Sequence, residues 1–319
     1  MKRKVLITGG LGYLGGRIAL HIEKNTNFSI RISARPRKLK YPSLSNKIEI
    51  FDFDLETSIN YSELCDEVET IVHLAGLNAK DAHTSPERAN LINVDGTNSL
   101  INAATKTGVK RFIYISTAHI YGSPLAGKVD ETKEENPQSP YAQTHFLAEK
   151  LVLSEKKLEG IVLRLSNVIG SPADKNANCW TLVANELCRT AITTQKIELR
   201  GDGQELRDFI CMRDVIAIIE LFLNIHSDKL SFKLFNIASG QSMRTIDLAH
   251  LIASRAKLHF GGRQNISYQN YATYNKLETL NICINRLNLL GYSPSKKIVD
   301  EVDSILMFCK KNYSKEFNQ

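Results

Sequence analysis

Long hydrophobic runs are absent from this sequence of 319 residues. After a basic opening, the first apolar run is only Val5-Leu6-Ile7, and a glycine-rich turn follows it directly. A signal-peptide core or a transmembrane helix needs a much longer run. We therefore expect a cytoplasmic protein with no membrane partner.

Closely spaced cysteines are also absent. No two of the six cysteines have the short separation that is typical of a zinc site or of a disulfide framework. We expect reduced thiols and no metal. The six are Cys65, Cys179, Cys188, Cys211, Cys283 and Cys309.

Blocks of one charge are missing, although the net charge is +7. Lysine and arginine are interspersed with aspartate and glutamate, and no basic stripe is interleaved with aromatic residues. Low-complexity tracts and solenoid repeats are missing too. We expect no nucleic-acid partner, and a nucleotide diphosphate ligand would account for the basic charge.

A strand, a glycine turn and a helix follow one another at the N-terminus. Val5-Leu6-Ile7 is typical of a buried strand, and the helical pattern after Thr8–Gly15 includes Ile18 and Ile22. Glycines at positions 9, 12 and 15 allow a tight turn, and the helix N-terminus favours a pyrophosphate. This pattern predicts a dinucleotide site, with a purely structural turn as the alternative.

Strands and helices continue to alternate as far as about Leu165. Such alternation predicts an α/β fold with a doubly wound parallel sheet of the Rossmann type. Ligands then bind at the carboxyl ends of the strands.

The end of the second strand indicates which nicotinamide cofactor binds. An acidic side chain there would bind ribose hydroxyls, but Ser33-Ala34 is followed by Arg35-Pro36-Arg37-Lys38. Small and cationic side chains suit a 2'-phosphate. The sequence favours NADP over NAD, and a solvated basic loop is the alternative reading.

A helix with two polar residues on one face is predicted after Ser139-Pro140, which is a serine N-cap followed by proline at the first helical position. Tyr141 and His145 lie four residues apart, so their side chains are neighbours on this helix.

These residues closely resemble the catalytic stretch of the extended short-chain dehydrogenases. Ser116-Thr117-Ala118-His119-Ile120-Tyr121-Gly122 precedes Tyr141-x-x-x-His145, where that family has Tyr-x-x-x-Lys. The resemblance implies an NAD(P)-dependent enzyme of the sugar-nucleotide epimerase/dehydratase type. Tyr141 would be the acid or base, Thr117 would orient it, and His145 would take the place of the lysine. A histidine with a pKa near 6.5 would supply a weaker and pH-dependent positive field.

The same resemblance implies a set of cofactor contacts. Asp54-Leu55 is similar to an adenine-contacting pair, and His73-Leu74-Ala75-Gly76 and Asn93-Val94-Asp95-Gly96-Thr97 are similar to turns beside the cofactor. We interpret His73 as a satisfied strand-end histidine. The expected cofactor residues are Gly9, Gly12, Tyr13, Leu14, Arg35, Asp54, Leu55, Leu74, Ala75, Gly76, Asn93, Tyr141 and His145.

The resemblance covers almost the whole chain and implies a discontinuous substrate lobe. A Rossmann domain of residues 1–167, with return segments at about 205–238, would accompany a lobe of residues 168–204 and 239–319. Arg207 and Asn178 match residues that contact the diphosphate in sugar-nucleotide members of the family, although Arg207 could equally hold Asp208 or another carboxylate. Asn167 and His119 would face the substrate, and a packed polar residue is the alternative for His119. Trp180 would belong to the core or flank a base or sugar.

The resemblance to this family also limits the reaction types that we expect. Sugar-nucleotide dehydratases carry an Asp-Glu pair where this chain has Ala118 and His119, so redox chemistry without loss of water is expected at C4 of a nucleotide-diphosphate sugar. A 4-ketoreductase is favoured by NADP, a 4-epimerase is the alternative, and a non-catalytic cofactor sensor is the alternative of another class. Glycan or surface-polysaccharide precursors would be the context, and a homodimer the assembly.

Overall fold

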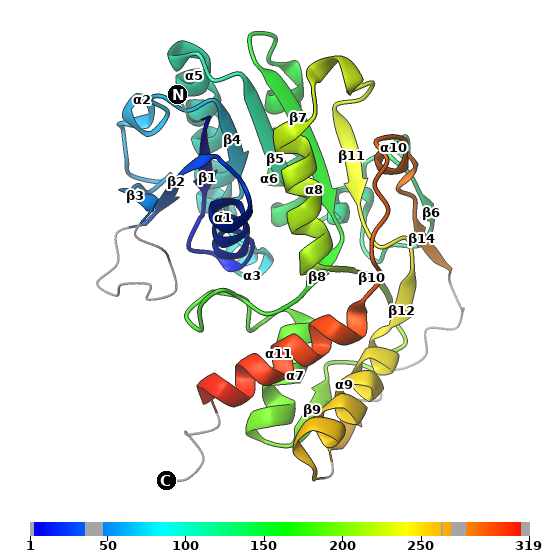
Figure 1. Ribbon diagram of the computed structural model, residues 1–319. Coiled ribbons are helices and arrows are strands. Elements are labelled where there is room, and N and C mark those ends of the chain that lie inside the picture. The colour runs from blue at the N-terminus through cyan, green and yellow to red at the C-terminus, as the bar shows by residue number, and fades with distance from the viewer. Residues whose placement is uncertain (1–2, 36–46, 263, 269–278, 314–319) are drawn as a thin grey trace. The chain divides into compact units, whose positions relative to one another are not determined.

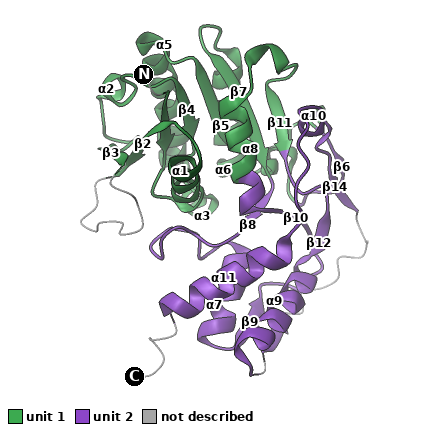
Figure 2. Ribbon diagram, viewed as in Figure 1, with its two compact units in different colours: residues 1–123, 131–165, 216–236 green, residues 124–130, 166–215, 237–319 purple. Residues whose placement is uncertain are grey.

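The computed structural model describes residues 3–35, 47–262, 264–268 and 279–313 (Figure 1). The chain forms two compact units, which Figure 2 distinguishes by colour. Unit 1 comprises residues 1–123, 131–165 and 216–236, and unit 2 comprises residues 124–130, 166–215 and 237–319.

Unit 1 contains a seven-stranded sheet in the order β11-β7-β5-β4-β1-β2-β3. The strands are β1 (Lys4–Thr8), β2 (Ser29–Ala34), β3 (Ile48–Asp52), β4 (Thr70–His73), β5 (Arg111–Thr117), β7 (Glu159–Leu165) and β11 (Leu234–Ile237). Strand β1 pairs in parallel with both β2 and β4, so the order reverses there. The doubly wound parallel fold is confirmed, and its ligand crevice is expected at this reversal.

Helices cover both faces of this sheet, which explains why its strands are almost continuously apolar. Figure 1 shows α1 on one face and α5 and α6 on the other. The helices are α1 (Tyr13–Asn25), α2 (Tyr61–Leu64), α3 (Ala79–Thr84), α4 (Pro86–Asn90), a π-helical turn η1 (Leu91–Asp95), α5 (Gly96–Thr107), a 3-10 turn η2 (Ala118–Tyr121), α6 (Pro140–Ser154), α8 (Met212–Asn224) and a 3-10 turn η3 (Ser227–Lys229).

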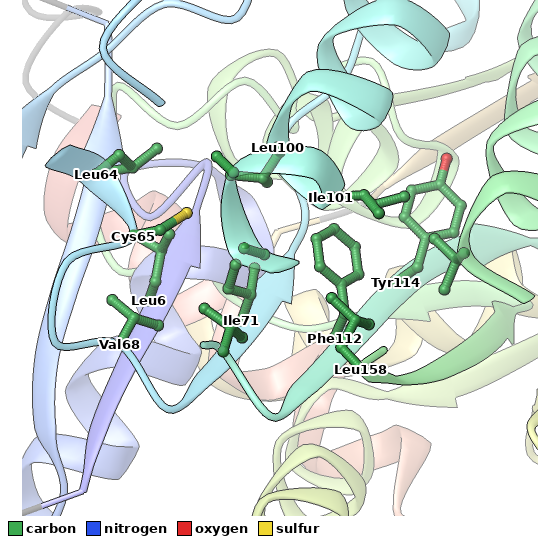
Figure 3. Packing of buried hydrophobic residues seen from close by; sticks show 14 of the residues in the cluster. Leu6, Leu64, Cys65, Val68, Ile71, Leu100, Ile101, Phe112, Tyr114 and Leu158 are labelled. Atoms are coloured by element: carbon green, nitrogen blue, oxygen red, sulfur yellow. The ribbon is translucent and has the colours of Figure 1, made fainter. Parts of the chain in front are cut away.

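The core between the sheet and the α5–α6 side is shown in Figure 3. Leu6, Ile71 and Phe112 come from three neighbouring strands, and Leu100 and Val152 come from the covering helices. All five are completely or almost completely buried. This packing holds α6, which carries Tyr141 and His145, against the sheet.

Unit 2 is built on three small sheets and four helices. Its strands are β6 (Gly127–Val129), β8 (Asn167–Ile169), β9 (Lys196–Leu199), β10 (Leu206–Cys211), β12 (Ser242–Arg244), β13 (Asn265–Tyr268) and β14 (Leu280–Ile282). Its helices are α7 (Val183–Thr193), α9 (Thr245–Phe260), α10 (Asn285–Leu289) and α11 (Ile298–Tyr313). Side chains of α7, α9 and α11 form its core with β9 and β10.

The return to unit 1 begins later than the expected residue 205. Strand β10 pairs with β8 and β12, so residues 205–215 belong to unit 2, and the chain rejoins unit 1 at Ile216 within α8. The buried carboxylate of Asp208 explains this grouping, because it accepts hydrogen bonds from Ser166 Oγ, Ser239 N and Gln241 N. These contacts join β10 to segments on both sides of it within unit 2.

None of the helices in the described residues is long and apolar enough to span a lipid bilayer. All six cysteines are free thiols with buried side chains. Burial raises the pKa of several of them, including that of Cys65 to about 12, so these thiols stay protonated at neutral pH.

Candidate active site

The glycine turn after β1 has the geometry of a phosphate cradle. Gly9 has a φ of +65°, which favours glycine, and its carbonyl accepts a hydrogen bond from Gly12 N at 2.8 Å. A Cβ on Gly15 would lie 2.3 Å from Gly9 O, so no side chain fits there. Tyr13 and Leu14 are the first residues of α1, whose N-terminal amides face this turn. The residues present therefore fit a dinucleotide pyrophosphate.

The end of β2 carries positive charge and, unexpectedly, an acid nearby. Arg35 is exposed directly after Ala34, and its charge helps to lower the pKa of Glu56, although Arg88 is the main cause. Arg88 and Glu56 form an ion pair at 2.6 Å. Glu56 lies after β3, far from Arg35 in the sequence, so local sequence patterns did not indicate that the two charges interact. Arg37 and Lys38 lie outside the described residues.

Asp54 and Leu55 form the turn that follows β3. Asp54 Oδ1 accepts a hydrogen bond from Glu56 N at 3.0 Å, which fixes the turn. Leu55 is half-buried, and its side chain lies against Gly96 at the start of α5.

His73 is held at the end of β4 by hydrogen bonds on both ring nitrogens. Thr8 Oγ1 accepts from the amides of Leu74 and Ala75, so its single proton goes to His73 Nδ1 at 2.6 Å. His73 Nε2 then donates to Thr97 Oγ1 at 3.0 Å. Burial lowers the pKa of His73 to about 3. His73 is thus neutral and fixes the Leu74–Ala75 turn.

Asn93 connects this turn to α6. It lies in the π-helical turn, where its Oδ1 accepts from Leu77 N at 2.8 Å and its Nδ2 donates to Thr144 Oγ1 at 3.0 Å. A Cβ on Gly76 would lie 3.0 Å from Asn93 Oδ1. Asn93 therefore positions the loop after β4 relative to the helix of Tyr141.

Tyr141 and Thr117 are brought together by α6 and the end of β5. Ser139 is the N-cap of α6, because its Oγ accepts from Ala142 N at 3.2 Å, as the sequence predicted. Tyr141 is hydrogen-bonded to Thr117 through their side chains. Burial raises the pKa of Tyr141, and the Thr117 hydrogen bond only partly opposes this rise. Tyr141 is consequently a neutral phenol at physiological pH.

His145 lies against Tyr141 but carries no charge. The two rings meet edge to face with centroids 4.4 Å apart, and His145 Nδ1 lies 2.8 Å from the Tyr114 hydroxyl. Burial lowers the pKa of His145 to about 4, and the charge of His119 adds to this effect. The expectation of a partly protonated imidazolium is therefore wrong, because an ordinary pKa near 6.5 applies only to a solvated ring.

His119 and Ala118 follow Thr117 in the short turn η2. His119 is exposed, whereas Ala118 is 2% exposed. The His119 amide donates to Thr117 Oγ1 at 3.2 Å, so the turn also fixes the Thr117 side chain. His119 is thus the titratable group of this turn that is open to solvent.

Three of the expected substrate residues lie in unit 2, although only Asn178 was expected in the substrate lobe and Asn167 and Arg207 were expected in the Rossmann domain. Asn167 Nδ2 donates to Asp208 O at 3.0 Å, and Arg207 forms an ion pair with Glu205 at 2.7 Å. Asn178 is exposed and lies in the segment before α7, whose first residue is Val183.

Trp180 belongs to an aromatic cluster of unit 2. Its ring stacks on Phe308 with centroids 6.0 Å apart and meets Tyr313 edge to face at 5.2 Å. Its indole nitrogen donates to Lys175 O. These contacts give Trp180 a packing role.

Two buried features of the site were not found from the sequence. Tyr114 is one, and the other is Arg164 on β7, which binds Glu149 of α6 through Nε at 3.0 Å and Nη2 at 2.7 Å. Arg164 Nη2 also donates to Glu135 at 2.8 Å. Glu149 lies eight residues after Tyr141, so helical periodicity could have placed both on one face.

Comparisons with known proteins identify a matching family model and related sequences. The model of the NAD dependent epimerase/dehydratase family matches residues 5–238. A putative UDP-glucose 4-epimerase of Methanocaldococcus jannaschii is 25% identical over 323 residues, covering 97% of this chain and 99% of that protein. A dTDP-D-glucose 4,6-dehydratase of Mus musculus is 23% identical over 329 residues, covering 98% and 90%.

A solved structure has the same fold. UDP-glucuronic acid 4-epimerase from Bacillus cereus, in complex with UDP-glucuronic acid and NAD, superposes with a TM-score of 0.81. The match covers 97% of this chain and 100% of that chain, at 20% identity.

Proposed function

Because the chain belongs to the NAD-dependent epimerase/dehydratase family, we propose that it is an oxidoreductase acting at C4 of a nucleotide-diphosphate sugar. Within this class we propose a 4-ketoreductase. The observation that carries this choice is the state of Tyr141, which is a neutral phenol beside a neutral histidine. A protonated phenol is the acid that reduction of a ketone requires.

In the proposed reaction, a bound reduced nicotinamide would supply a hydride to C4. Tyr141 donates its proton to the C4 oxygen, so the carbonyl becomes a secondary alcohol. Thr117 donates a hydrogen bond to the phenolate that remains, and solvent then returns the proton to Tyr141. Elimination of a hydroxyl group is not part of this reaction, and buried Ala118 offers no acid or base for it.

A 4-epimerase is the second candidate, and the names of the relatives favour it. An epimerase must first oxidise an alcohol, for which Tyr141 has to accept a proton. Its raised pKa opposes this step. The two candidates thus differ in the protonation state that Tyr141 needs at the start.

NADP is the proposed cofactor. Ser33 and Ala34 provide no carboxylate at the end of β2, and exposed Arg35 supplies a cation for a 2'-phosphate. NAD is the alternative, since the family is described as NAD-dependent.

The nucleotide-sugar ligand would be held by Asn167, Asn178, Arg207 and His119. Arg207 binds Glu205 through Nε and Nη2, so its remaining N–H groups would contact the diphosphate. A homodimer is proposed through the α6 side of unit 1, where Leu147 is 44% exposed.

One experiment separates the candidates. The protein is incubated with NADPH and a nucleotide-diphosphate 4-keto-6-deoxy sugar, and separately with UDP-glucose and NAD. A ketoreductase consumes NADPH in proportion to the 4-hydroxy product, whereas an epimerase interconverts C4 epimers with no net change in cofactor. Turnover only in the second incubation would overturn the reductase proposal. Cofactor binding with no turnover in either would favour a sensor.

A further inference from the structure

Tyr114 is a buried polar residue to which the proposed reaction assigns no role. It lies on β5, is 3% exposed, and places its hydroxyl 2.8 Å from Nδ1 of His145. Figure 3 shows its hydroxyl pointing away from Phe112 and the apolar cluster. In the described part of the chain, His145 is the only hydrogen-bond partner of this hydroxyl.

The direction of this hydrogen bond follows from its partners. Burial raises the pKa of Tyr114 well above 10, so the hydroxyl keeps its proton. The nearest acceptor for that proton is His145 Nδ1, because no other acceptor contacts the hydroxyl among the described residues. The Tyr114 hydroxyl therefore donates, and the single proton of neutral His145 lies on Nε2.

Nε2 of His145 has no hydrogen-bond partner within the described residues. It is also not sealed inside the protein, because it is not among the fully buried side-chain atoms without partners, which in the described segments are Ser116 Oγ, Arg164 Nη1 and Gln264 Oε1. The ring thus presents an N–H donor at the accessible side of a residue that is 9% exposed.

The acid that follows His145 on α6 is Glu149, one helical turn further on, and Arg164 binds it through Nε and Nη2. Among the described side chains whose contacts with the His145 ring are given, none is an acid. The titratable groups around it are Tyr141 of α6, Tyr114 of β5, His119 of η2 and His73 of β4. All of these are neutral or cationic. Protonation at Nδ1 would also remove the acceptor of the Tyr114 hydroxyl. The surrounding charges and this hydrogen bond therefore both favour the neutral ring.

We propose that Tyr114 is a positioning residue that fixes His145 as a neutral Nε2–H donor to a hydroxyl oxygen of the ligand bound beside Tyr141. The ligand and the reaction rest on the proposed function, but the Tyr114–His145 arrangement does not. A permanent cation at position 145 would favour ionised Tyr141, whereas a neutral donor binds the ligand and leaves Tyr141 protonated.

The first test needs no substrate. Protein with 15N-labelled histidine is studied by NMR from pH 5.5 to 8, and His145→Gln identifies the His145 signals. We expect a protonated Nε2 and an unprotonated, hydrogen-bonded Nδ1 throughout. Tyr114→Phe should convert this into a mixture of tautomers. A proton on Nδ1 in the wild type, or an unchanged tautomer in Tyr114→Phe, would overturn the proposal.

Tyr121→Phe is the matched control. Tyr121 is also buried, and its hydroxyl donates to Asn236 Oδ1 at 2.8 Å without contacting His145. Both variants lose one buried hydroxyl, but only Tyr114→Phe should change the His145 signals. Equal changes in the two variants would indicate a general packing effect and would contradict the assignment.

The second test measures ligand binding. Tyr114→Phe should weaken NADPH binding by about threefold to tenfold, which corresponds to one misdirected hydrogen bond. Unchanged NADPH affinity, with an altered tautomer, would overturn the ligand contact while keeping the Tyr114–His145 bond. If the protein shows no 4-keto sugar turnover but both tests succeed, only the proposed reaction fails.

Discussion

Two buried histidines of unit 1 differ in what their ring nitrogens do. His73 has hydrogen-bond partners on both nitrogens, Thr8 and Thr97, whereas Tyr114 is the only partner of His145 among the residues that the structure describes. Both rings are neutral because burial lowers their pKa values to about 3 and about 4. Both ring nitrogens of His73 are occupied, whereas His145, beside Tyr141, keeps an N–H donor for a ligand. We call the His73 side the closed end and the Tyr141–His145 side the open end. Burial alone therefore does not distinguish a structural histidine from a functional one.

The largest expected effect is at the open end. Tyr141→Phe should lower turnover of a 4-keto sugar nucleotide by about 100- to 10,000-fold, because the proton donor is lost. NADPH affinity should change only a few-fold, since the ring and its contact with His145 remain. Steady-state kinetics and calorimetric titration check both parts. Near wild-type rates would show that Tyr141 is not the acid.

A substitution at the closed end, at His73, should lower the stability of the fold. His73→Leu leaves the Thr8 hydroxyl proton without its acceptor and Thr97 Oγ1 without its histidine donor, and we expect a loss of about 2–4 kcal/mol in the free energy of unfolding. His145→Leu should cost less, because it releases only Tyr114. Urea denaturation of both variants checks this order. Equal losses would break the comparison between the two histidines.

Much of this arrangement could be predicted from local sequence. The glycine turn, the Ser139 cap and the Tyr141–His145 spacing depend on neighbouring residues, and the parallel sheet follows from alternating elements. The Tyr114–His145 bond could not be predicted in the same way, because it depends on how β5 faces α6. The assignment of β10 to unit 2 also depends on tertiary contacts, because it follows from the pairing of this strand with β8 and β12.

The pKa of His145 shows the same limit. Its ordinary value predicted partial charge at neutral pH, and only the burial of the ring corrects this value. The motifs thus named candidate residues such as Tyr141 and His145, whereas the protonation state of His145 depends on the surrounding packing.

Acid pH should test both histidines together. Their folded pKa values lie below the unfolded value of about 6.5, so the unfolded chain binds more protons as pH falls from 6.5 towards 4. Each histidine should then reduce stability by about 1.4 kcal/mol per pH unit in that window. His145→Gln should remove one such contribution. Urea denaturation between pH 4.5 and 7, with the same slope in wild type and variant, would contradict the low pKa of His145.

A cation at the open end should alter the pH profile. Because His145 does not titrate between pH 6 and 9, we expect the pH dependence of the rate in that range to follow the ionisation of Tyr141. His145→Lys should lower the pKa of Tyr141 by about 1–3 units, because a nearby positive charge favours the phenolate. Oxidation of a 4-hydroxy sugar should then gain rate near neutral pH, and reduction should lose rate at high pH. Superimposable pH-rate profiles would show that position 145 does not act electrostatically on Tyr141.

The smallest expected effect is on cofactor preference, and it concerns Arg35, which belongs to neither the open end nor the closed end. NADPH should bind about tenfold more tightly than NADH, and Arg35→Ala should abolish most of this preference while leaving NADH affinity unchanged. Glu56→Gln should increase the preference slightly, because it removes a carboxylate whose pKa responds to Arg35. Neither variant should change the tautomer of His145 or the stability of the His73 end. Calorimetric titration with both cofactors provides the measurement. Equal affinities in the wild type, or tighter binding of NADH, would show that the cation after β2 does not select the 2'-phosphate, and the reductase proposal would then depend on Tyr141 alone.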